Sequence, residues 1–282
     1  MIIMTRYYKF IMIIISLFVI FTLYQMYNKT ATTMKYFPID MNSSIVDSET
    51  KLSFDAEQKK INWIVSSTGS QPVYLRQDLS LLYENGVFKG LQNKWNTDKK
   101  TLEQEESVPY TKDARLQSIS FHHGELHNDE ITSIQAMTDA SLYIIEEENR
   151  LNAFQQPQSP FEKEGSKKIN EQTEGNLQEQ LHSLLSYYNI DRDSYIVTPL
   201  TNLGKQSENK LLSSLEENNA KALGQFWEGL YSEYVTLLMS YPDEIPKHYV
   251  PFILIAKDES HVLVLYEIEQ EKYKLIQQIS TN

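Results

Sequence analysis

Residues 79–91 read LSLLYENGVFKGL, and this stretch is the strongest local indication of the fold. The dipeptide Asn85-Gly86 separates two apolar runs. Both central residues of a type I′ turn need a positive φ, which Asn and Gly tolerate better than other residues. The stretch therefore predicts a tight β-hairpin, and with it an antiparallel sheet.

Strand patterns extend outward from this hairpin over residues 37–150. Apolar and polar residues alternate on both sides of a charged turn at 57–60, as half-buried strands require: Leu52, Phe54 and Ala56, then Ile61, Trp63 and Val65. Further strands are expected within 116–126, 131–136 and 141–145, and the polar stretch 96–113 is expected to be a long loop. Residues 37–150 are thus predicted to form an antiparallel, β-rich region.

Residues 151–175 differ from their surroundings in composition. They combine Pro157 and Pro160 with many Gln, Glu, Lys, Gly and Ser residues and few apolar ones. Such a segment can bury little surface, which is typical of linkers and long exposed loops. We expect it to separate two domains or to form a loop within one.

Residues 176–282 favour helices followed by a small sheet. Asn176 and Glu179 have the spacing of a helix N-cap and its N3 partner, and apolar residues at helical spacing follow. A long amphipathic stretch at 207–240 carries an apolar face: Leu223, Phe226, Trp227, Leu230, Tyr231, Tyr234 and Leu238. A C-terminal three-strand antiparallel meander is expected at 250–256, 261–267 and 273–279. Strands with helices packed across one face give an α+β fold class.

The N-terminus predicts a membrane anchor. Residues 10–28 are 19 residues without a charge, and a helix of that length spans about 28 Å, close to the ~30 Å hydrocarbon core of a bilayer. Arg6 and Lys9 favour a cytoplasmic N-terminus. We expect residues 1–30 to be a cytoplasmic stub and an uncleaved transmembrane signal-anchor that places a single-pass protein in the cell membrane. The body of the chain is then extracytoplasmic, and a cleaved signal peptide is the alternative.

Charge and cysteine content exclude several function classes. The net charge is −12, and because residues 1–30 carry +3, the remaining chain carries −15. An acidic chain is repelled by phosphate backbones, so we expect no nucleic-acid partner. The chain has no cysteine, which excludes disulfides, thiol nucleophiles and thiolate metal sites.

One cluster of side chains has the chemistry of a metal site. On a strand, His123, Glu125 and His127 share one face, and two imidazoles with a carboxylate suit Zn²⁺. A zinc ion with an open position would make the protein a metal-dependent hydrolase. Against this, side chains two apart on a strand lie about 7 Å apart, the helical H-E-x-x-H pattern is missing, and Gly124 equally suits a polar turn.

Other catalytic signals are weak or missing, so the catalytic residues remain unassigned and no nucleotide cofactor is expected. There is no G-x-S-x-G, no G-x-G-x-x-G and no phosphate-binding loop. Ser207 and Lys210 fit S-x-x-K without its companion motifs, and a serine at a helix start is a favoured cap.

Two functions follow from these observations. We favour a non-catalytic, membrane-anchored interaction or regulatory module of the cell envelope that binds another envelope protein. The alternative is an extracytoplasmic hydrolase that uses His123, Glu125 and His127. An enzyme is thus the less favoured of the two readings.

Overall fold

The computed structural model describes residues 35, 37–147, 150–203, 219–241 and 247–278. Residues 35–282 form one compact unit. This unit corrects the expected fold class, because the chain is mostly β, with 56% strand and 25% helix, and is not an even α+β mixture. The difference arises largely because the strands are much longer than their alternating patterns indicated.

The expected transmembrane signal-anchor is not supported. Within the described part of the chain, no helix is both long enough and apolar enough to cross a membrane. Residues 10–28, on which that expectation was based, lie outside the described residues.

The hairpin predicted at Asn85-Gly86 is confirmed. Asn85 has φ 50° and Gly86 has φ 78°, the left-handed values that the turn requires. The strands that it joins are β2 (Lys60–Glu84) and β3 (Val87–Pro109). The loop expected at 96–113 is therefore wrong, since most of it continues β3; one face of this half of β3 is exposed, which explains its polar composition.

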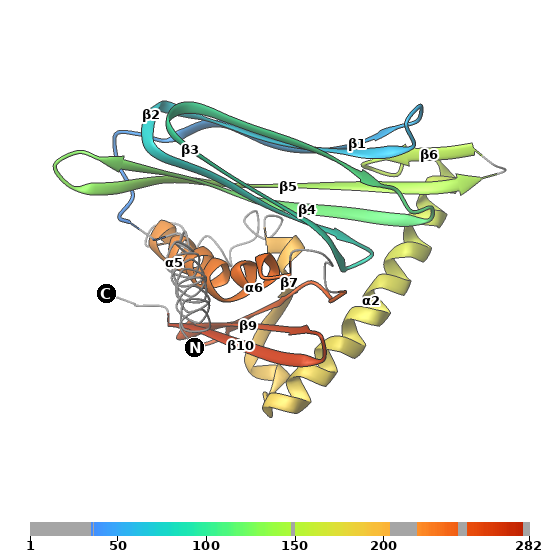
Figure 1. Cartoon of the computed structure of the whole chain (residues 1–282). Coiled ribbons are helices and arrows are strands. Elements are labelled where there is room, and N and C mark those ends of the chain that lie inside the picture. The colour runs from blue at the N-terminus through green and yellow to red at the C-terminus, as the bar shows by residue number, and fades with distance from the viewer. Residues whose placement is uncertain (1–34, 36, 148–149, 204–218, 242–246, 279–282) are drawn as a thin grey trace, which may run out of the picture. The chain divides into compact units, whose positions relative to one another are not determined.

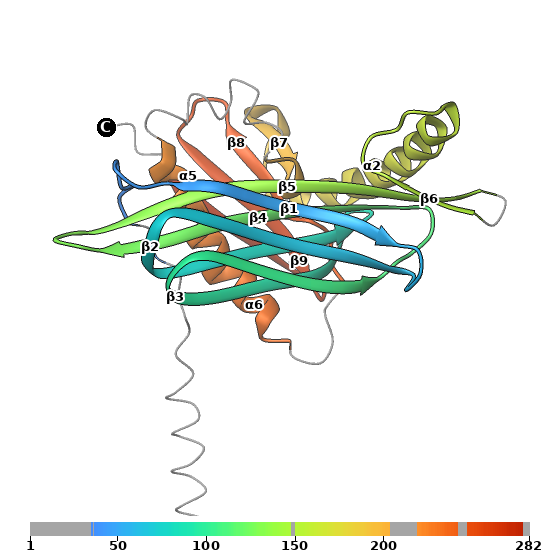
Figure 2. The same ribbon diagram turned by 90° about the horizontal axis from the view of Figure 1, so that it is seen from above.

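The large sheet bends back over itself along this hairpin. Its strand order is β1-β2-β4-β5-β6, with β3 on the other side of β2. The β2–β3 register breaks between Thr68 and Val73. The half of β2 before the break pairs with β1, whereas the half after it pairs with β4, so two parts of one sheet face each other (Figures 1 and 2). The remaining strands are β1 (Ile45–Asp55), β4 (Ala114–His127), β5 (Ile131–Glu147) and β6 (Arg150–Phe154).

Apolar side chains fill one end of the space between the two facing parts. Trp63, Val65 and Leu52 from the first part meet Leu82 and Leu116 from the second, and all five are essentially unexposed. At about 25 cal/mol per Å² of apolar surface, this cluster is a major source of stability for the folded-over sheet.

A smaller four-stranded sheet lies beyond the helices α5 and α6, which separate it from the large sheet (Figure 1). Its order is β10-β9-β8-β7. The three expected C-terminal strands are present, but β7 joins them, so they are not a separate meander. The elements of this part are β7 (Tyr195–Pro199), α5 (Asn219–Leu230), a π-helical turn (Tyr231–Val235), α6 (Thr236–Met239), β8 (Phe252–Ala256), β9 (His261–Ile268) and β10 (Glu271–Gln278), with short 3₁₀ turns at Arg192–Ser194 and Leu200–Asn202.

The linker expected at 151–175 is also wrong. Residues 150–154 form β6, and α2 (Pro160–Tyr188) begins well before Asn176. Ser159 caps the helix by accepting a hydrogen bond from the Glu162 backbone N–H, and the Glu162 side chain accepts one from the Ser159 backbone. This capping box starts the helix. A narrow stripe of small and apolar side chains then faces the body of the protein, and the remaining faces are polar, which explains why the composition resembled a linker.

Gly86 should tolerate no side chain. A Cβ atom at this position would lie 3.1 Å from Leu177 of α2, and the φ of 78° is unfavourable for any L-residue with a side chain. We expect Gly86→Val to lower the free energy of unfolding by about 2–3 kcal/mol, as measured by urea denaturation. Gly175→Ala is the matched control, because its Cβ would meet nothing within 4 Å and alanine favours a helix by about 0.5–1 kcal/mol. Equal stability of the two variants would contradict this assignment.

Candidate functional site

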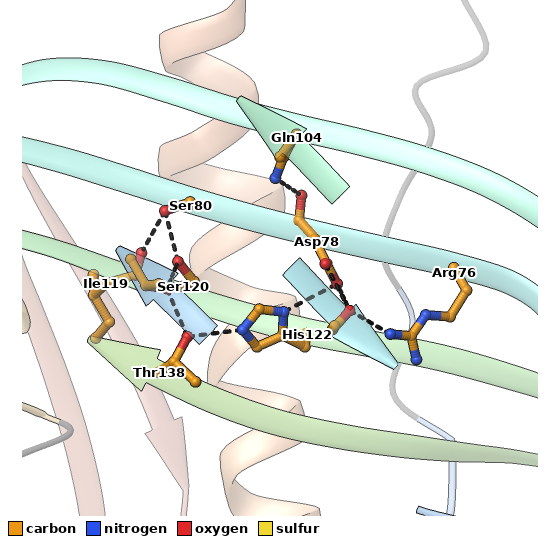
Figure 3. Close-up of polar contacts among 10 residues, drawn as sticks. Arg76, Asp78, Ser80, Gln104, Ile119, Ser120, His122 and Thr138 are labelled. Carbon is orange, nitrogen blue, oxygen red and sulfur yellow. Dashed lines mark hydrogen bonds and ion pairs between the residues drawn. The ribbon is translucent and has the colours of Figure 1, made fainter. Parts of the chain in front are cut away.

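A chain of polar side chains occupies the other end of the space inside the folded sheet (Figure 3). Asp78 of β2 and His122 of β4 are direct cross-strand partners, and the side chains of both have no exposed surface. Ser67 donates to both carboxylate oxygens of Asp78, at 2.8 and 2.6 Å, and Arg76 Nη2 donates to Ser67 Oγ. His122 Nδ1 lies 3.1 Å from Asp78 Oδ1, although the two are not aligned as a hydrogen bond. The bend in β2 produces this arrangement, because it turns Ser67 back toward Asp78.

Hydroxyl groups continue the chain beyond His122. His122 Nε2 lies 2.8 Å from Thr138 Oγ1, which is 2.6 Å from Thr50 Oγ1. Thr50 donates to Ser120 at 2.5 Å, and Ser120 lies 2.6 Å from the Ser80 hydroxyl. These residues come from β1, β2, β4 and β5, so the chain connects both facing parts of the sheet. We refer to the set running from Arg76 to Ser80 through these contacts as the interior polar network.

The order of Asp78, His122 and Thr138 is that of a carboxylate, an imidazole and a hydroxyl in nucleophilic catalysis. Two observations favour a structural role. The Asp78 and His122 side chains are unexposed, and the Thr138 hydroxyl also forms a hydrogen bond with the Thr50 hydroxyl. A buried polar group must find partners inside the protein, and this network supplies them.

Arg76 is the member of the network whose burial most opposes folding. Its side chain is unexposed, and its Nε and Nη1 atoms have no hydrogen-bond partner among the described residues. Burial lowers the pKa of Arg76, and the nearby carboxylate of Asp78 partly opposes that shift. Both nitrogens are buried, so a ligand cannot reach them unless the surrounding residues move.

His123, Glu125 and His127 do lie together on one face of β4, opposite to that of His122. His123 Nε2 is 3.7 Å from Glu125 Oε1, and His127 Nε2 is 3.2 Å from Glu125 Oε2. The two imidazoles therefore lie on opposite sides of one carboxylate. In the part of the chain that the structure describes, no group of three histidine or acidic side chains has an arrangement that could hold a metal ion.

Glu125 should make stability depend on pH. Burial raises the pKa of Glu125, but Coulombic attraction from His123 and the hydrogen bond with His127 outweigh burial, so the pKa of Glu125 lies below its ordinary value. A lowered folded-state pKa stabilises the protein above the unfolded-state pKa, and this stabilisation is lost as the pH falls through the folded-state pKa. We expect Glu125→Gln to lower the free energy of unfolding at pH 7 and to match the unchanged protein below that folded-state pKa, in urea titrations at both pH values.

The control for this prediction is Glu57→Gln in the exposed β1–β2 turn. Its effect on stability should be small and the same at both pH values. A Glu125→Gln effect that does not change with pH would show that the carboxylate charge is not the source of the stabilisation.

A second buried hydrogen-bond series connects the large sheet to the helices. The Tyr234 hydroxyl lies 3.0 Å from that of Tyr83 and 2.7 Å from His248 Nε2. Burial raises the pKa of both phenols, so they are neutral at physiological pH. Tyr234 lies in the π-helical turn. The series gives the buried hydroxyls partners and fixes the helix against β2.

The exposed end of the β4–β5 hairpin carries apolar side chains. The Tyr74 ring stacks on His127 at 3.8 Å between centroids and 16° between planes. Ile131 is the cross-strand partner of His127. Tyr74 is 53% exposed and Ile131 is 42% exposed. We refer to Tyr74, His127 and Ile131 together as the hairpin-end surface.

Sequence reasoning named His127 but assigned it to a metal, and it missed Tyr74. The one available signal was that Tyr74 is an aromatic residue within a predominantly polar part of β2. Its contact with His127 depends on the irregular backbone of β2 near the bend, which no local pattern predicts.

Comparison with known proteins gives no relative: no protein-family model, no curated protein and no solved structure matches this chain.

Proposed function

We propose that this protein is a non-catalytic binding module that docks another protein through the hairpin-end surface. The observation that carries this proposal is the exposed, stacked pair of Tyr74 and His127 beside Ile131. Exposed apolar side chains that form a contiguous patch often mark interaction sites, and aromatic residues are enriched at protein interfaces.

The surroundings of this surface support docking. Met41 is 91% exposed and lies next to Asp40, whose backbone N–H donates to Ser133 of β5, two residues from Ile131. Glu125 also restrains the His127 ring of this stack, because Glu125 Oε2 lies 3.2 Å from His127 Nε2. A surface that is already rigid loses little conformational entropy on binding, which favours affinity.

Site-specific photo-crosslinking tests the proposal in the full-length protein. A photoreactive side chain is placed at Tyr74 or at Ile131 in cells, and the crosslinked products are identified by mass spectrometry. The matched controls are Tyr187 and Ile276, which are 64% and 55% exposed and lie elsewhere on the molecule. We expect one shared product from Tyr74 and Ile131 that is absent from both controls.

Two substitutions test whether the crosslinked product depends on the hairpin-end surface. Ile131→Asp should abolish the product obtained from the Tyr74 position, whereas Ile276→Asp should leave it unchanged. If all four positions give the same products, or if Ile131→Asp has no effect, docking through the hairpin-end surface is refuted.

A further inference from the structure

We propose that the partner presents a basic segment, with an arginine side chain over the exposed face of Tyr74. This inference rests on the proposed function and specifies the chemistry of the partner. Two independent observations support it: the charge of the segments around the hairpin-end surface, and the nature of the aromatic stack at its centre.

The segments that meet at this end are strongly acidic. Residues 37–47, 70–76 and 123–134 contain five acids and one base. The base is Arg76, which is unexposed inside the folded sheet. The acids are Asp40, Asp47, Glu125, Asp129 and Glu130, and all except Glu125 reach the surface. The exposed bases Lys99 and Lys100 lie in β3, where Lys99 is the cross-strand partner of Val73 next to Tyr74, so the acidic border is confined to the β4–β5 side of the surface.

The position of these acids relative to the surface is defined by contacts. Asp129 and Glu130 form the β4–β5 turn directly before Ile131. Asp40 Oδ2 accepts a hydrogen bond at 3.1 Å from Thr132 Oγ1, which follows Ile131 in the chain and lies on the other face of β5. The backbone N–H of Asn42 is the main cause that lowers the pKa of Asp40, so this carboxylate stays charged. The apolar centre is thus bordered by carboxylates on its β4–β5 side, and charge complementarity favours a basic partner.

The stack explains why arginine suits the centre. One face of the Tyr74 ring is covered by His127, and the residue is 53% exposed. A guanidinium is planar and weakly hydrated, so it stacks on an aromatic face while donating hydrogen bonds at its edge to carboxylates. A lysine ammonium can make the charge contact but not the planar stack.

Peptide binding to the purified full-length protein tests this chemistry. The probes are three fluorescent peptides, GSRLRLRSG, GSKLKLKSG and GSELELESG, measured by anisotropy at low and at physiological salt. We expect binding in the order Arg, then Lys, with none for Glu. Affinity should fall as salt rises, because the exposed charges are screened. Equal binding of the Arg and Glu peptides would overturn the inference.

Variants locate the binding. Asp129→Lys combined with Glu130→Lys should weaken binding of the Arg peptide at least about tenfold. Tyr74→Leu should reduce the preference for Arg over Lys while leaving the salt dependence. The control is Asp258→Lys with Glu259→Lys, an exposed acidic pair in the β8–β9 turn, which should leave affinity within about twofold. Equal loss in the control would show non-specific attraction to an acidic protein and would refute the site.

The two experiments separate the inference from the function on which it rests. If Tyr74 and Ile131 crosslink one partner but its crosslinked peptide has no basic residue, docking stands and the basic partner is refuted. If no surface-specific product forms, the proposed function fails, whatever the peptides do.

Discussion

Asp78→Ala should lower the free energy of unfolding by about 3–5 kcal/mol, the cost of leaving a buried charge without its neighbouring counter-charge. The Ser67 hydroxyl lies 2.8 and 2.6 Å from the two carboxylate oxygens, which share its one proton, and Asp78 Oδ1 lies 3.1 Å from His122 Nδ1. It also opposes the cost of burying Arg76. Without it, an unexposed guanidinium has no counter-charge. Chemical denaturation monitored by tryptophan fluorescence measures this loss, and Asp47→Ala on the exposed side of β1 is the control, with an expected change within about 0.5 kcal/mol.

A double variant distinguishes unpaired charge from lost packing. Arg76→Met with Asp78→Leu removes both charges and keeps apolar volume. Because well-packed apolar residues often replace a buried ion pair without loss, we expect this variant to be more stable than Asp78→Ala. If it is equally unstable, the network acts through its shape and its hydroxyl contacts, and the electrostatic account is wrong.

Trp227→Ala should have a comparable effect, about 3–5 kcal/mol, which is typical of removing a large buried aromatic side chain. Trp227 of α5 is unexposed and stacks on Phe121 of β4 at 4.9 Å with 13° between the ring planes. The indole N–H has no hydrogen-bond partner among the described residues. Its contribution is therefore apolar, and Trp227→Phe should lose much less, about 1–2 kcal/mol.

The same variants report on how the helix is held. If α5 packs on the large sheet mainly through this stack, Trp227→Ala should increase amide hydrogen exchange more strongly in α5 than in β2 near Trp63. An equal loss of protection at both places would indicate global destabilisation alone, and no additional loss in α5 would mean that the stack does not anchor the helix.

The parts of the fold that depend on local chemistry could be predicted. The turn at Asn85-Gly86 follows from two adjacent residues that accept a positive φ, and the last three strands follow from apolar runs. The predictions that failed depended on average composition. The polar half of β3 is a strand with an exposed face, and α2 uses a stripe too narrow to change the composition of residues 151–175.

The sites were predictable only to the extent that they lie on one strand. Alternation along β4 correctly places His123, Glu125 and His127 on one face. The interior polar network joins Ser67, Asp78 and His122 through the β2 bend and the β2–β4 register, and the stack of Tyr74 on His127 depends on the same bend. These pairings arise between segments that carry no sequence signal for one another.

The folded-over sheet also constrains how the chain reaches its native state. The β2–β3 hairpin can close from its turn outward, because each new residue pair forms next to a pair that is already in place. By contrast, the contacts of Thr50 with Ser120 and Thr138 join residues that are 70 and 88 positions apart in the chain. Closing such long loops costs conformational entropy before any contact stabilises the closed loop. Sheets rich in such contacts fold in milliseconds to seconds. Closing β1 over β5 seals Arg76, Asp78 and His122 from water. While the sheet is open these groups are hydrated, so we expect the network to slow reopening of the closed sheet more than it speeds closure.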